Sequence, residues 1–228
     1  MNQRLQKAVL NNISWCSFVC DTHEIKQTAT ENLWGTLSKA PAFYPDLITK
    51  NSHVTENDVW GFINNRKVGS IKDSFATLNL SAMGFKVLLE AEWIYHEPLS
   101  ERESTEPLQW QIIAAETELS KWTALQGSTN SLKPSLLKRP EIKFFLREKK
   151  EGIEGFIANA GAGVIGVSNV FSSGVTSDNL WTDIVKELSV IFPDTPLVGY
   201  EHSEALHEAR RAGWSSLGPL QIWVSRNL

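Results

Sequence analysis

A glycine-rich segment, residues 157–171, constrains the fold more than any other stretch, because it reads IANAGAGVIGVSNVF. Its residues 161–166, GAGVIG, match the G-x-G-x-x-G spacing of a dinucleotide-binding loop. That loop requires a helix to open at the last glycine, yet β-branched and aromatic residues follow Gly166. The segment therefore predicts two antiparallel strands joined by a tight turn at residues 160–163, where glycine tolerates positive φ.

The residues around this hairpin predict further strands and capped helices. The expected strands of the C-terminal half are EIKFFLRE (141–148), the two hairpin strands, PLVGYE (196–201) and LGPLQIWV (217–224). Asp178 or Ser177 is expected to cap a helix over residues 179–192. Ser203 is expected to cap a second helix, which Gly213 ends.

The N-terminal half alternates helical and strand-like patterns as well. Thr55, with Asp58 three residues later, predicts the start of a helix over residues 56–65. The other expected elements are strands at 13–20 and 84–96, a strand then a helix within 108–125, and helices over 28–38 and from about Asp73 to Met83. Together these patterns predict an α/β protein with a mixed, mostly antiparallel sheet flanked by helices.

A polar segment, residues 126–134, divides the chain into a half at 1–126 and a half at 133–228. The two halves share a spacing: Asp73 precedes Gly84 by 11 residues, and His202 precedes Gly213 by 11 residues. Each glycine is followed by an aromatic residue and a strand that carries a tryptophan. If this spacing reflects a repeated unit, residues 85–95 and 217–224 should occupy equivalent places, with Trp93 and Trp223 buried.

The order of elements in residues 138–224 resembles the GCN5-related N-acetyltransferase (GNAT) superfamily. The match comprises the hairpin that ends in VIGVSNVF, the helix after SSGVTSD, the strand LVGYE, the helix EALHEARRAG and the pair Gly213-Trp214. The N-terminal half resembles a partial second copy of the same unit. The resemblance implies an N-acyltransferase that uses acetyl-CoA or another acyl-CoA as co-substrate and a small-molecule amine or peptide as acceptor.

The resemblance also implies where the acyl-CoA lies. Pantetheine would enter a gap between VIGVSNVF and PLVGYE, and the pyrophosphate would meet backbone N–H groups at the start of the next helix. The cofactor-binding residues implied in this way are Val170, Phe171, Ser172, Ser173, Gly174, Thr176 and Ser177. The loop departs from the family pattern, because it has one glycine, no basic residue and Asp178 close by. An ordinary turn with a helix cap is therefore the alternative interpretation of these residues.

Two family positions carry unexpected residues. The family often has a tyrosine four residues before the Gly-aromatic pair, where it protonates the leaving thiolate; this chain has Ala209. The asparagine common seven residues earlier is His202. The alternative to an enzyme is consequently a non-catalytic GNAT-like module that binds a ligand or a partner.

Glu201 and His202 are the candidate catalytic residues, because they follow a buried strand at its carboxyl end. A carboxylate or an imidazole there could remove a proton from an ammonium before the amine attacks a thioester. The alternative interpretation is that His202 and Ser203 only begin a helix and that Glu201 pairs with a lysine. Glu90, Glu92 and His96 share one face of the strand at 84–96, which is interpreted either as a solvated face or as part of a cleft between the halves. The basic residues Lys138, Arg139, Lys143, Arg147, Lys149 and Lys150 either contact a CoA phosphate or solvate a strand edge.

Composition excludes several other classes. The net charge of −4 gives no basic field for nucleic acid, and no run of about 20 apolar residues would cross a membrane. The N-terminal residues lack the apolar core of a signal peptide, so a cytoplasmic location is expected. Cys16 and Cys20 fit no metal or redox spacing and are expected to be buried thiols, and no metal is expected. The sequence leaves the oligomeric state open.

The loop at Ser172–Ser177 gives the first testable prediction. Gly174→Pro removes a backbone donor and distorts the loop, so calorimetry should show CoA binding weakened by about tenfold or more, or about 1.4 kcal/mol. Unchanged binding in a folded variant would assign the loop to a turn alone.

Overall fold

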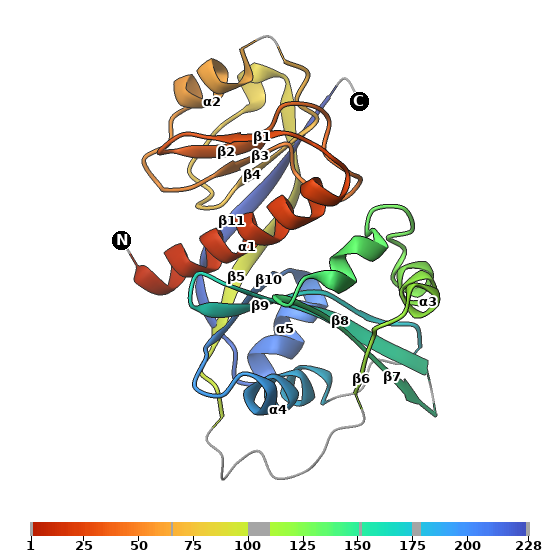
Figure 1. Ribbon diagram of the computed structural model, residues 1–228. Helices are drawn as coiled ribbons and strands as arrows, with labels where there is room; N and C mark the ends of the chain where they lie inside the picture. The colour runs from red at the N-terminus through yellow and green to blue at the C-terminus, as the bar shows by residue number, and fades with distance from the viewer. Residues whose placement is uncertain (1, 65, 100–109, 151, 175–178, 227–228) are drawn as a thin grey trace.

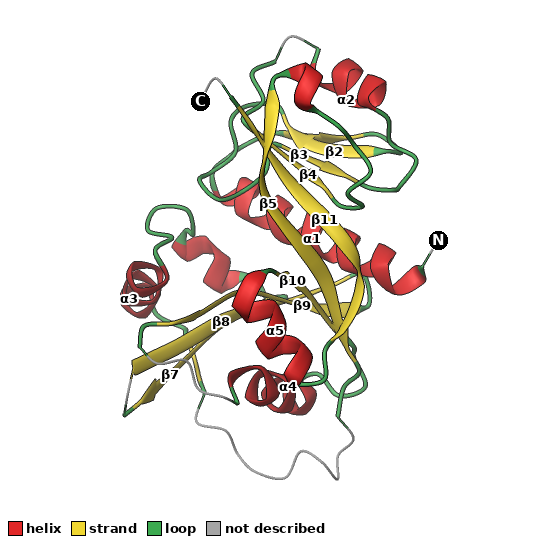
Figure 2. Ribbon diagram, turned by 180° about the vertical axis from the view of Figure 1, so that it is seen from behind, coloured by secondary structure: helices red, strands yellow, loops and turns green. Residues whose placement is uncertain are grey.

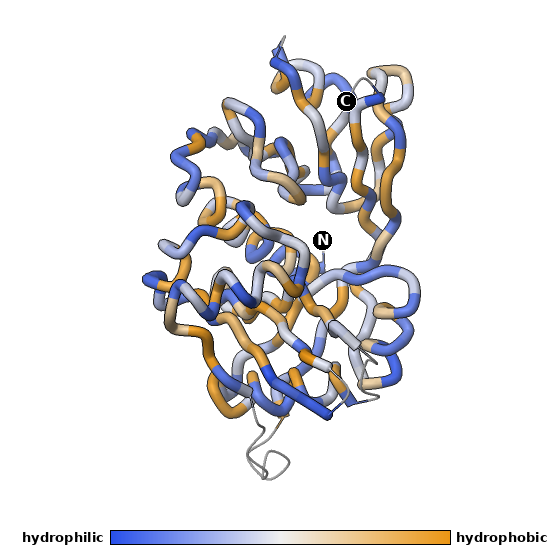
Figure 3. The backbone as a smooth tube through the Cα atoms, turned by 90° about the vertical axis from the view of Figure 1, so that its right-hand side faces the viewer, coloured by the Kyte–Doolittle hydropathy of each residue, from blue (hydrophilic) through white to orange (hydrophobic). Residues whose placement is uncertain are grey.

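The computed structural model describes residues 2–64, 66–99, 110–150, 152–174 and 179–226 and shows two lobes joined by a pair of long strands (Figure 1). The upper lobe holds β1 to β4 and α2, and the lower lobe holds β6 to β10 with α3, α4 and α5. The long strands β5 and β11 run from one lobe into the other (Figure 2). In Figure 3 hydrophobic segments lie in both lobes, so each lobe has apolar chain to bury.

The helical elements are α1 (Gln3–Thr22), α2 (Glu56–Ile63), the 3₁₀ turns η1 (Ser81–Met83) and η2 (Pro134–Lys138), α3 (Glu116–Gln126), α4 (Leu180–Ile191) and α5 (Ser203–Arg211). The strands are β1 (Gln27–Ala29), β2 (Leu33–Thr36), β3 (Leu47–Thr49), β4 (Ser70–Asp73), β5 (Phe85–His96), β6 (Gln111–Ile112), β7 (Ile142–Lys149), β8 (Gly152–Gly161), β9 (Val164–Ser172), β10 (Leu197–Glu201) and β11 (Ser215–Ser225). No helix within the described ranges is long and apolar enough to cross a membrane.

One sheet of 11 described strands runs through both lobes, in the order β1-β2-β3-β4-β11-β5-β10-β9-β8-β7-β6. Its pairing repeats about the central β11–β5 pair. On one side β3 is parallel to β4, and β4 is antiparallel to β11. On the other side β9 is parallel to β10, and β10 is antiparallel to β5. The mixed, mostly antiparallel sheet flanked by helices is therefore confirmed.

The long strands exchange places between the two halves of the sequence. The C-terminal strand β11 pairs with β4 of the N-terminal half, while β5 pairs with β10 of the C-terminal half. Gly84 and Gly213, which precede these strands, both have positive φ, at 85° and 91°. Trp93 is 1% exposed and Trp223 is 5% exposed. The equivalent placement of the two strands and the burial of both tryptophans are confirmed; the division into units at 1–126 and 133–228 stays a prediction.

The sheet of the lower lobe is covered by different helices on its two faces. Trp93 and Tyr95 of β5 pack with Ala8 and Val9 of α1. Ile94, which lies between them in sequence, packs instead with side chains of α4 and α5. Because neighbouring residues of a strand point to opposite faces, α1 lies on one face of this sheet and α4 and α5 on the other.

The strand expected at residues 13–20 is wrong, since these residues belong to α1. The buried positions of this segment, Trp15, Cys16, Val19 and Cys20, follow a helical spacing of one, four and five residues. Cys16 and Cys20 are both free, and both are buried, as expected. Burial raises their pKa values to about 11 and about 12, which keeps both groups as thiols at neutral pH.

Three other local expectations are wrong. Residues 28–38 form β1 and β2, and residues 73–83 contain the end of β4 and only the short turn η1. His202, without a side-chain hydrogen bond to the helix, is the residue that caps α5, and Ser203 is its first residue. The Asp178 and Ser177 cap lies outside the described residues. The Thr55 and Asp58 capping box, the long strand β5, and the strands β7 to β11 are confirmed.

The glycine-rich segment forms the predicted hairpin. Strand β8 pairs with β9 up to Gly161 and Val164, and the turn residues Ala162 and Gly163 have φ of 54° and 70°. These two positive values are those of a type I′ turn, whose twist matches that of the flanking strands. The dinucleotide-binding interpretation is therefore excluded.

Two buried asparagines join α1 to this hairpin. The Asn11 side-chain N–H donates to the Asn159 carbonyl at 3.0 Å, and the Asn159 side-chain N–H donates to Asn11 Oδ1 at 3.0 Å. A Cβ atom at Gly166 would lie 2.0 Å from Asn11 Oδ1 and 2.5 Å from Asn159 Oδ1. Glycine is therefore required at position 166 to leave room for the amide pair.

We expect Gly166→Ala to lower the free energy of unfolding by about 2–4 kcal/mol, because the added methyl group separates the two amides and leaves buried polar atoms unpaired. Urea denaturation measures this change. Gly61→Ala in α2 is the control, since nothing lies within 4 Å of its added Cβ. That variant should gain about 0.5–1 kcal/mol, because alanine favours a helix over glycine. Equal stability of the two variants would contradict the packing described here.

Candidate functional site

The candidate site is a cavity of about 380 Å³ at the point where two parallel strands separate. Strands β9 and β10 pair only through Ile165 with Leu197 and Gly166 with Val198. Beyond these pairs, residues 167–170 of β9 and residues 200–202 at the end of β10 line the same cavity. Its volume is within the range of small-molecule sites.

A bulge in β9 shapes one wall of this cavity. Gly155 of β8 pairs with Phe171, and Ile157 pairs with Ser168, so Asn169 and Val170 together oppose one residue of β8. Asn169 has a φ of 53°, in the left-handed region that asparagine tolerates better than most residues. The bulge turns β9 away from the ladder where it passes the cavity, and bulges of this kind often accompany functional sites.

Glu201 lines the cavity from the other wall. Burial raises its pKa from 4.5 to about 8; the backbone N–H of His202 works in the opposite direction, and the charge of Glu208 adds to the rise. A carboxyl group in this state is poised to gain and lose a proton near neutral pH. The position therefore has the proton affinity of a general base or acid.

His202 lies next to Glu201 at the cavity but is exposed. Its Nδ1 is 3.0 Å from the Ser203 hydroxyl oxygen. Ala209 is fully buried in α5, among side chains of α4 and β10, and carries no group that could donate a proton. Position 209 therefore contributes packing to the lower lobe.

The residues expected to bind the cofactor follow the cavity toward α4. Val170 lines it, and the partly buried Phe171 meets Trp122 edge-on at 5.1 Å. The Ser173 N–H donates to the Ile153 carbonyl at 2.8 Å and is therefore not free to bind a phosphate. At this residue only the side-chain hydroxyl could contact a phosphate. Ser172 Oγ and the Gly174 N–H lie within 3.4 Å of each other. Thr176 and Ser177 lie outside the described residues.

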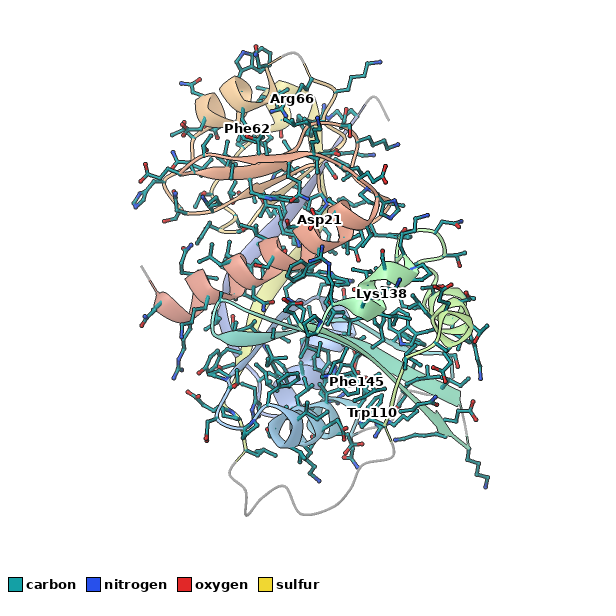
Figure 4. The ribbon with its side chains drawn as sticks, in the orientation of Figure 1. Asp21, Phe62, Arg66, Trp110, Lys138 and Phe145 are labelled. Atoms are coloured by element: carbon teal, nitrogen blue, oxygen red, sulfur yellow. The ribbon has the colours of Figure 1, made fainter. Side chains whose placement is uncertain are left out.

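Several of the basic residues of the C-terminal half form ion pairs with carboxylates. Arg147 is buried, stacks on Trp110, and contacts Glu154 and Asp183 at 2.7 Å each. Lys149 lies 3.6 Å from Glu154. Arg139 pairs with Asp21 at the end of α1. Figure 4 labels Asp21 in this helix and Lys138 in η2 below it. Figure 4 also shows Trp110 beside Phe145 in the lower lobe.

Several cavity residues were not predicted from the sequence. Lys72 of β4, Asn12 of α1, Tyr44, Ser168 and Tyr200 all line the same cavity as Glu201. Lys72 is 2% exposed, and its Nζ lies 2.8 Å from Asn12 Oδ1 and 4.1 Å from the centre of the Tyr200 ring. Lys72 stands between Ile71 and Asp73, and the helix expected from Asp73 onward gave no reason to place this lysine in a cavity.

The acidic face of β5 is mostly solvated. Glu90 is exposed and accepts a hydrogen bond from Gln221 at 3.0 Å, while Glu92 pairs with Arg210 at 2.6 Å. His96 packs edge-on against Trp214. Among the residues that the structure describes, no group of three or more histidine, cysteine or carboxylate side chains could hold a metal.

Two larger hollows, of about 720 and 1070 Å³, lie in the upper lobe beside α2. Arg66, stacked over Phe62 at 4.8 Å, lines both hollows, as Figure 4 lets the reader follow. Neither hollow is lined by Glu201 or by residues of β9 or β10. The volume of a cavity therefore does not identify the candidate site. The site is identified by the carboxyl of Glu201 and by the separation of β9 from β10.

Solved structures share this fold. A GCN5-related N-acetyltransferase from Kribbella flavida matches 96% of this chain and 96% of its own, at 13% identity and a TM-score of 0.59. A protein from Novosphingobium aromaticivorans placed in the GNAT family matches 92% of this chain and 96% of its own, at 13% identity and a TM-score of 0.53. A conserved protein of unknown function from Staphylococcus epidermidis matches 90% and 95%, at 11% identity and a TM-score of 0.58.

Sequence comparison adds no relative, since no family model and no curated protein matches the chain. The shared fold is therefore the result of these comparisons: the chain has the GNAT fold over nearly its whole length.

The raised pKa of Glu201 predicts a pH-dependent stability. Between pH 4.5 and about pH 8 the carboxyl of Glu201 is ionised in the unfolded chain and protonated in the folded chain. Folding therefore takes up a proton in this pH range. The stability contribution of Glu201 is therefore full below pH 4.5 and is lost as the pH rises to about 8. We expect the melting temperature of Glu201→Gln to rise relative to wild type across this window.

Paired thermal scans at pH 5, 6.5 and 8 measure this difference. Glu90→Gln removes an exposed carboxylate from the neighbouring strand and should follow the wild type at every pH. A constant difference between wild type and Glu201→Gln would contradict the raised pKa.

Proposed function

We propose that this chain, which has the GNAT fold, is an acyl-CoA-dependent N-acyltransferase in which Glu201 is the general base. One observation supports this most directly: a carboxyl group with a pKa near 8 lines a cavity opened by the separation of β9 from β10. In the proposed reaction an amine becomes acylated, and free CoA is released.

The residues around the cavity fit an acyl thioester. When bound, acyl-CoA supplies a carbonyl carbon that an amine can attack. Val167 and Val170 give apolar contact on β9, and the bulge at Asn169 interrupts the ladder beside them. The hydroxyl groups of Ser172 and Ser173 lie beyond Val170 along the chain, on the path toward α4. These features support Val170, Phe171, Ser172, Ser173 and Gly174 as the cofactor-binding residues, with Thr176 and Ser177 proposed next to them.

Glu201 prepares the acceptor. At neutral pH an aliphatic amine is an ammonium ion and has no free electron pair. The ionised Glu201 carboxylate removes one proton, directly or through one water, and the nitrogen then forms a C–N bond as the C–S bond breaks. The second proton that the nitrogen loses on becoming an amide passes to the departing thiolate, directly or through water, which gives free CoA thiol. The sulfur leaves as a thiolate with a pKa near 8.5, so a strong acid at position 209 is not essential. His202, exposed at the mouth of the cavity, is the proposed route for the proton to solvent.

We expect acetyl-CoA to raise the melting temperature of the protein, since a ligand at 100 times its Kd adds about 2.7 kcal/mol of stability. Glu201→Gln should keep this shift but lower kcat/KM by about tenfold or more, because it removes the base and not the cofactor site. The wild-type kcat/KM should rise with pH and level off above about 8, where the carboxyl is ionised.

Steady-state assays of CoA release on a panel of primary amines give these values. Glu90→Gln is again the matched control and should retain wild-type rates. His202→Ala should be the next most impaired variant. Binding of acetyl-CoA without transfer to any amine of the panel would instead favour a ligand-binding module, and full activity of Glu201→Gln would overturn the assignment of the base.

A further inference from the structure

Lys72 is a buried cation that makes no ion pair with the described residues. Its side chain is 2% exposed, and no carboxylate oxygen of the described chain lies within the 4 Å of an ion pair. The next residue, Asp73, points to the other face of β4, where it accepts hydrogen bonds from the Phe75 and Leu78 N–H groups. An ammonium ion removed from water without a counter-ion is destabilising by several kcal/mol.

The contacts that Lys72 does make are incomplete. Its Nζ donates to Asn12 Oδ1 at 2.8 Å and lies against the Tyr200 ring at 4.1 Å. An ammonium group has three N–H donors, and the ring is a weaker partner than a carboxylate. Lys72, Asn12 and Tyr200 all line the cavity, so the remaining donors are close to its interior.

Two hydroxyl groups of the same cavity donate to no described partner. The Tyr44 hydroxyl and the Ser168 hydroxyl are buried, and the group closest to acting on the Tyr44 oxygen is the Trp15 indole N–H, which can only donate. Burial raises the pKa of Tyr44 well above 10, so this hydroxyl keeps its proton and remains a donor. Buried polar groups in folded proteins normally have a partner, and unpaired ones call for a ligand or a water. The cavity therefore holds one cation and two unpaired hydroxyl donors.

We propose that Lys72, Tyr44 and Ser168 bind a carboxylate of the acceptor, so that the acceptor is an amine that also carries a carboxyl group, such as an amino acid. This inference rests on the proposed acyl transfer for its reaction, while the anion site itself rests on the residues above. A carboxylate has two oxygens that accept several hydrogen bonds, and its single negative charge matches the single charge of Lys72. A phosphate, with about twice that charge, would be left only half balanced.

Lys72 and Glu201 lie on opposite faces of the sheet, and this arrangement orients the proposed acceptor in the cavity. Tyr200 and Lys72 lie on the α1 face, because Tyr200 packs with the cluster of Val9 and Trp93. Glu201, the next residue of β10, points to the opposite face. One cavity reaches both, so an acceptor whose carboxylate is held at Lys72 extends its amine toward Glu201.

The first experiment measures binding without catalysis. N-acetylglycine and N-acetylphenylalanine serve as probes of the product, and their N-methylamides serve as neutral analogues. Calorimetry on the wild type should show each acid bound at least tenfold more tightly than its amide. Lys72→Met should remove this difference and keep the fold, because apolar replacement of a buried ion is often neutral or stabilising. Lys86→Met, at an exposed position, is the control for lost charge and should bind as the wild type does.

The second experiment measures specificity with acetyl-CoA as donor. Glycine, β-alanine and phenylalanine are each compared with their carboxamides. The wild type should prefer at least one acid over its amide by tenfold or more in kcat/KM, and Lys72→Met should reduce that ratio to about one while still acetylating the amide. Tyr44→Phe changes one atom and should reduce the ratio at least threefold, so it carries the test if Lys72→Met folds poorly.

The outcomes separate the two proposals. Equal binding of acids and amides by the wild type, or an acid preference that survives in both Lys72→Met and Tyr44→Phe, overturns the carboxylate site. Acid binding that depends on Lys72 in a protein that transfers no acyl group supports the site and overturns the proposed acyl transfer. Transfer to amines with no preference for acids leaves the proposed function standing and overturns this inference.

Discussion

The antiparallel pair of β5 and β11 is the contact on which the rest of the molecule depends. These strands are hydrogen-bonded from Phe85 with Ser225 to Tyr95 with Ser215, and each then joins the sheet of the opposite half. Since β-sheet hydrogen bonds fix both spacing and direction, this pair determines where the upper lobe stands relative to the lower one. The cavity, which takes Lys72 from the upper lobe and Glu201 from the lower, exists only in that arrangement.

The site contains two buried ionisable side chains in different states, a carboxyl that holds its proton and an ammonium that lacks a counter-ion among the described residues. Burial makes the charged form of Glu201 costly, so its carboxyl holds a proton to a pKa near 8. Lys72 is 2% exposed and has Asn12 Oδ1 and the Tyr200 ring beside its ammonium. Both side chains line one cavity. Glu201 can exchange a proton with an amine and Lys72 can bind an anion, so the cavity suits an acceptor that carries both an amine and a negative group.

The sequence predicted the lower lobe well, because its elements carry strong local signals. The Ala162-Gly163 turn, the alternating strands beside it and the 11-residue spacing to Gly213 all act over short distances. The upper lobe was predicted poorly, since β1 to β4 have only three or four residues each and depend on pairing with distant strands. The helix α1 was mistaken for a strand over residues 13–20 because this stretch, ISWCSFVC, is rich in β-branched and aromatic side chains. Lys72 could not be assigned a role, since nothing local brings it near Tyr200.

The exchange of strands also determines when the sheet can be completed during translation. Strand β11 lies between β4 and β5, so the edge of β4 stays open until Ser225 has left the ribosome. The N-terminal part of the chain, up to His96, cannot complete its share of the sheet while the chain is being made, although its described residues form β1 to β5. An open strand edge is a template for pairing with other chains. The N-terminal half therefore exposes this strand edge until the last strand is made, the situation in which incomplete sheets are most prone to aggregate.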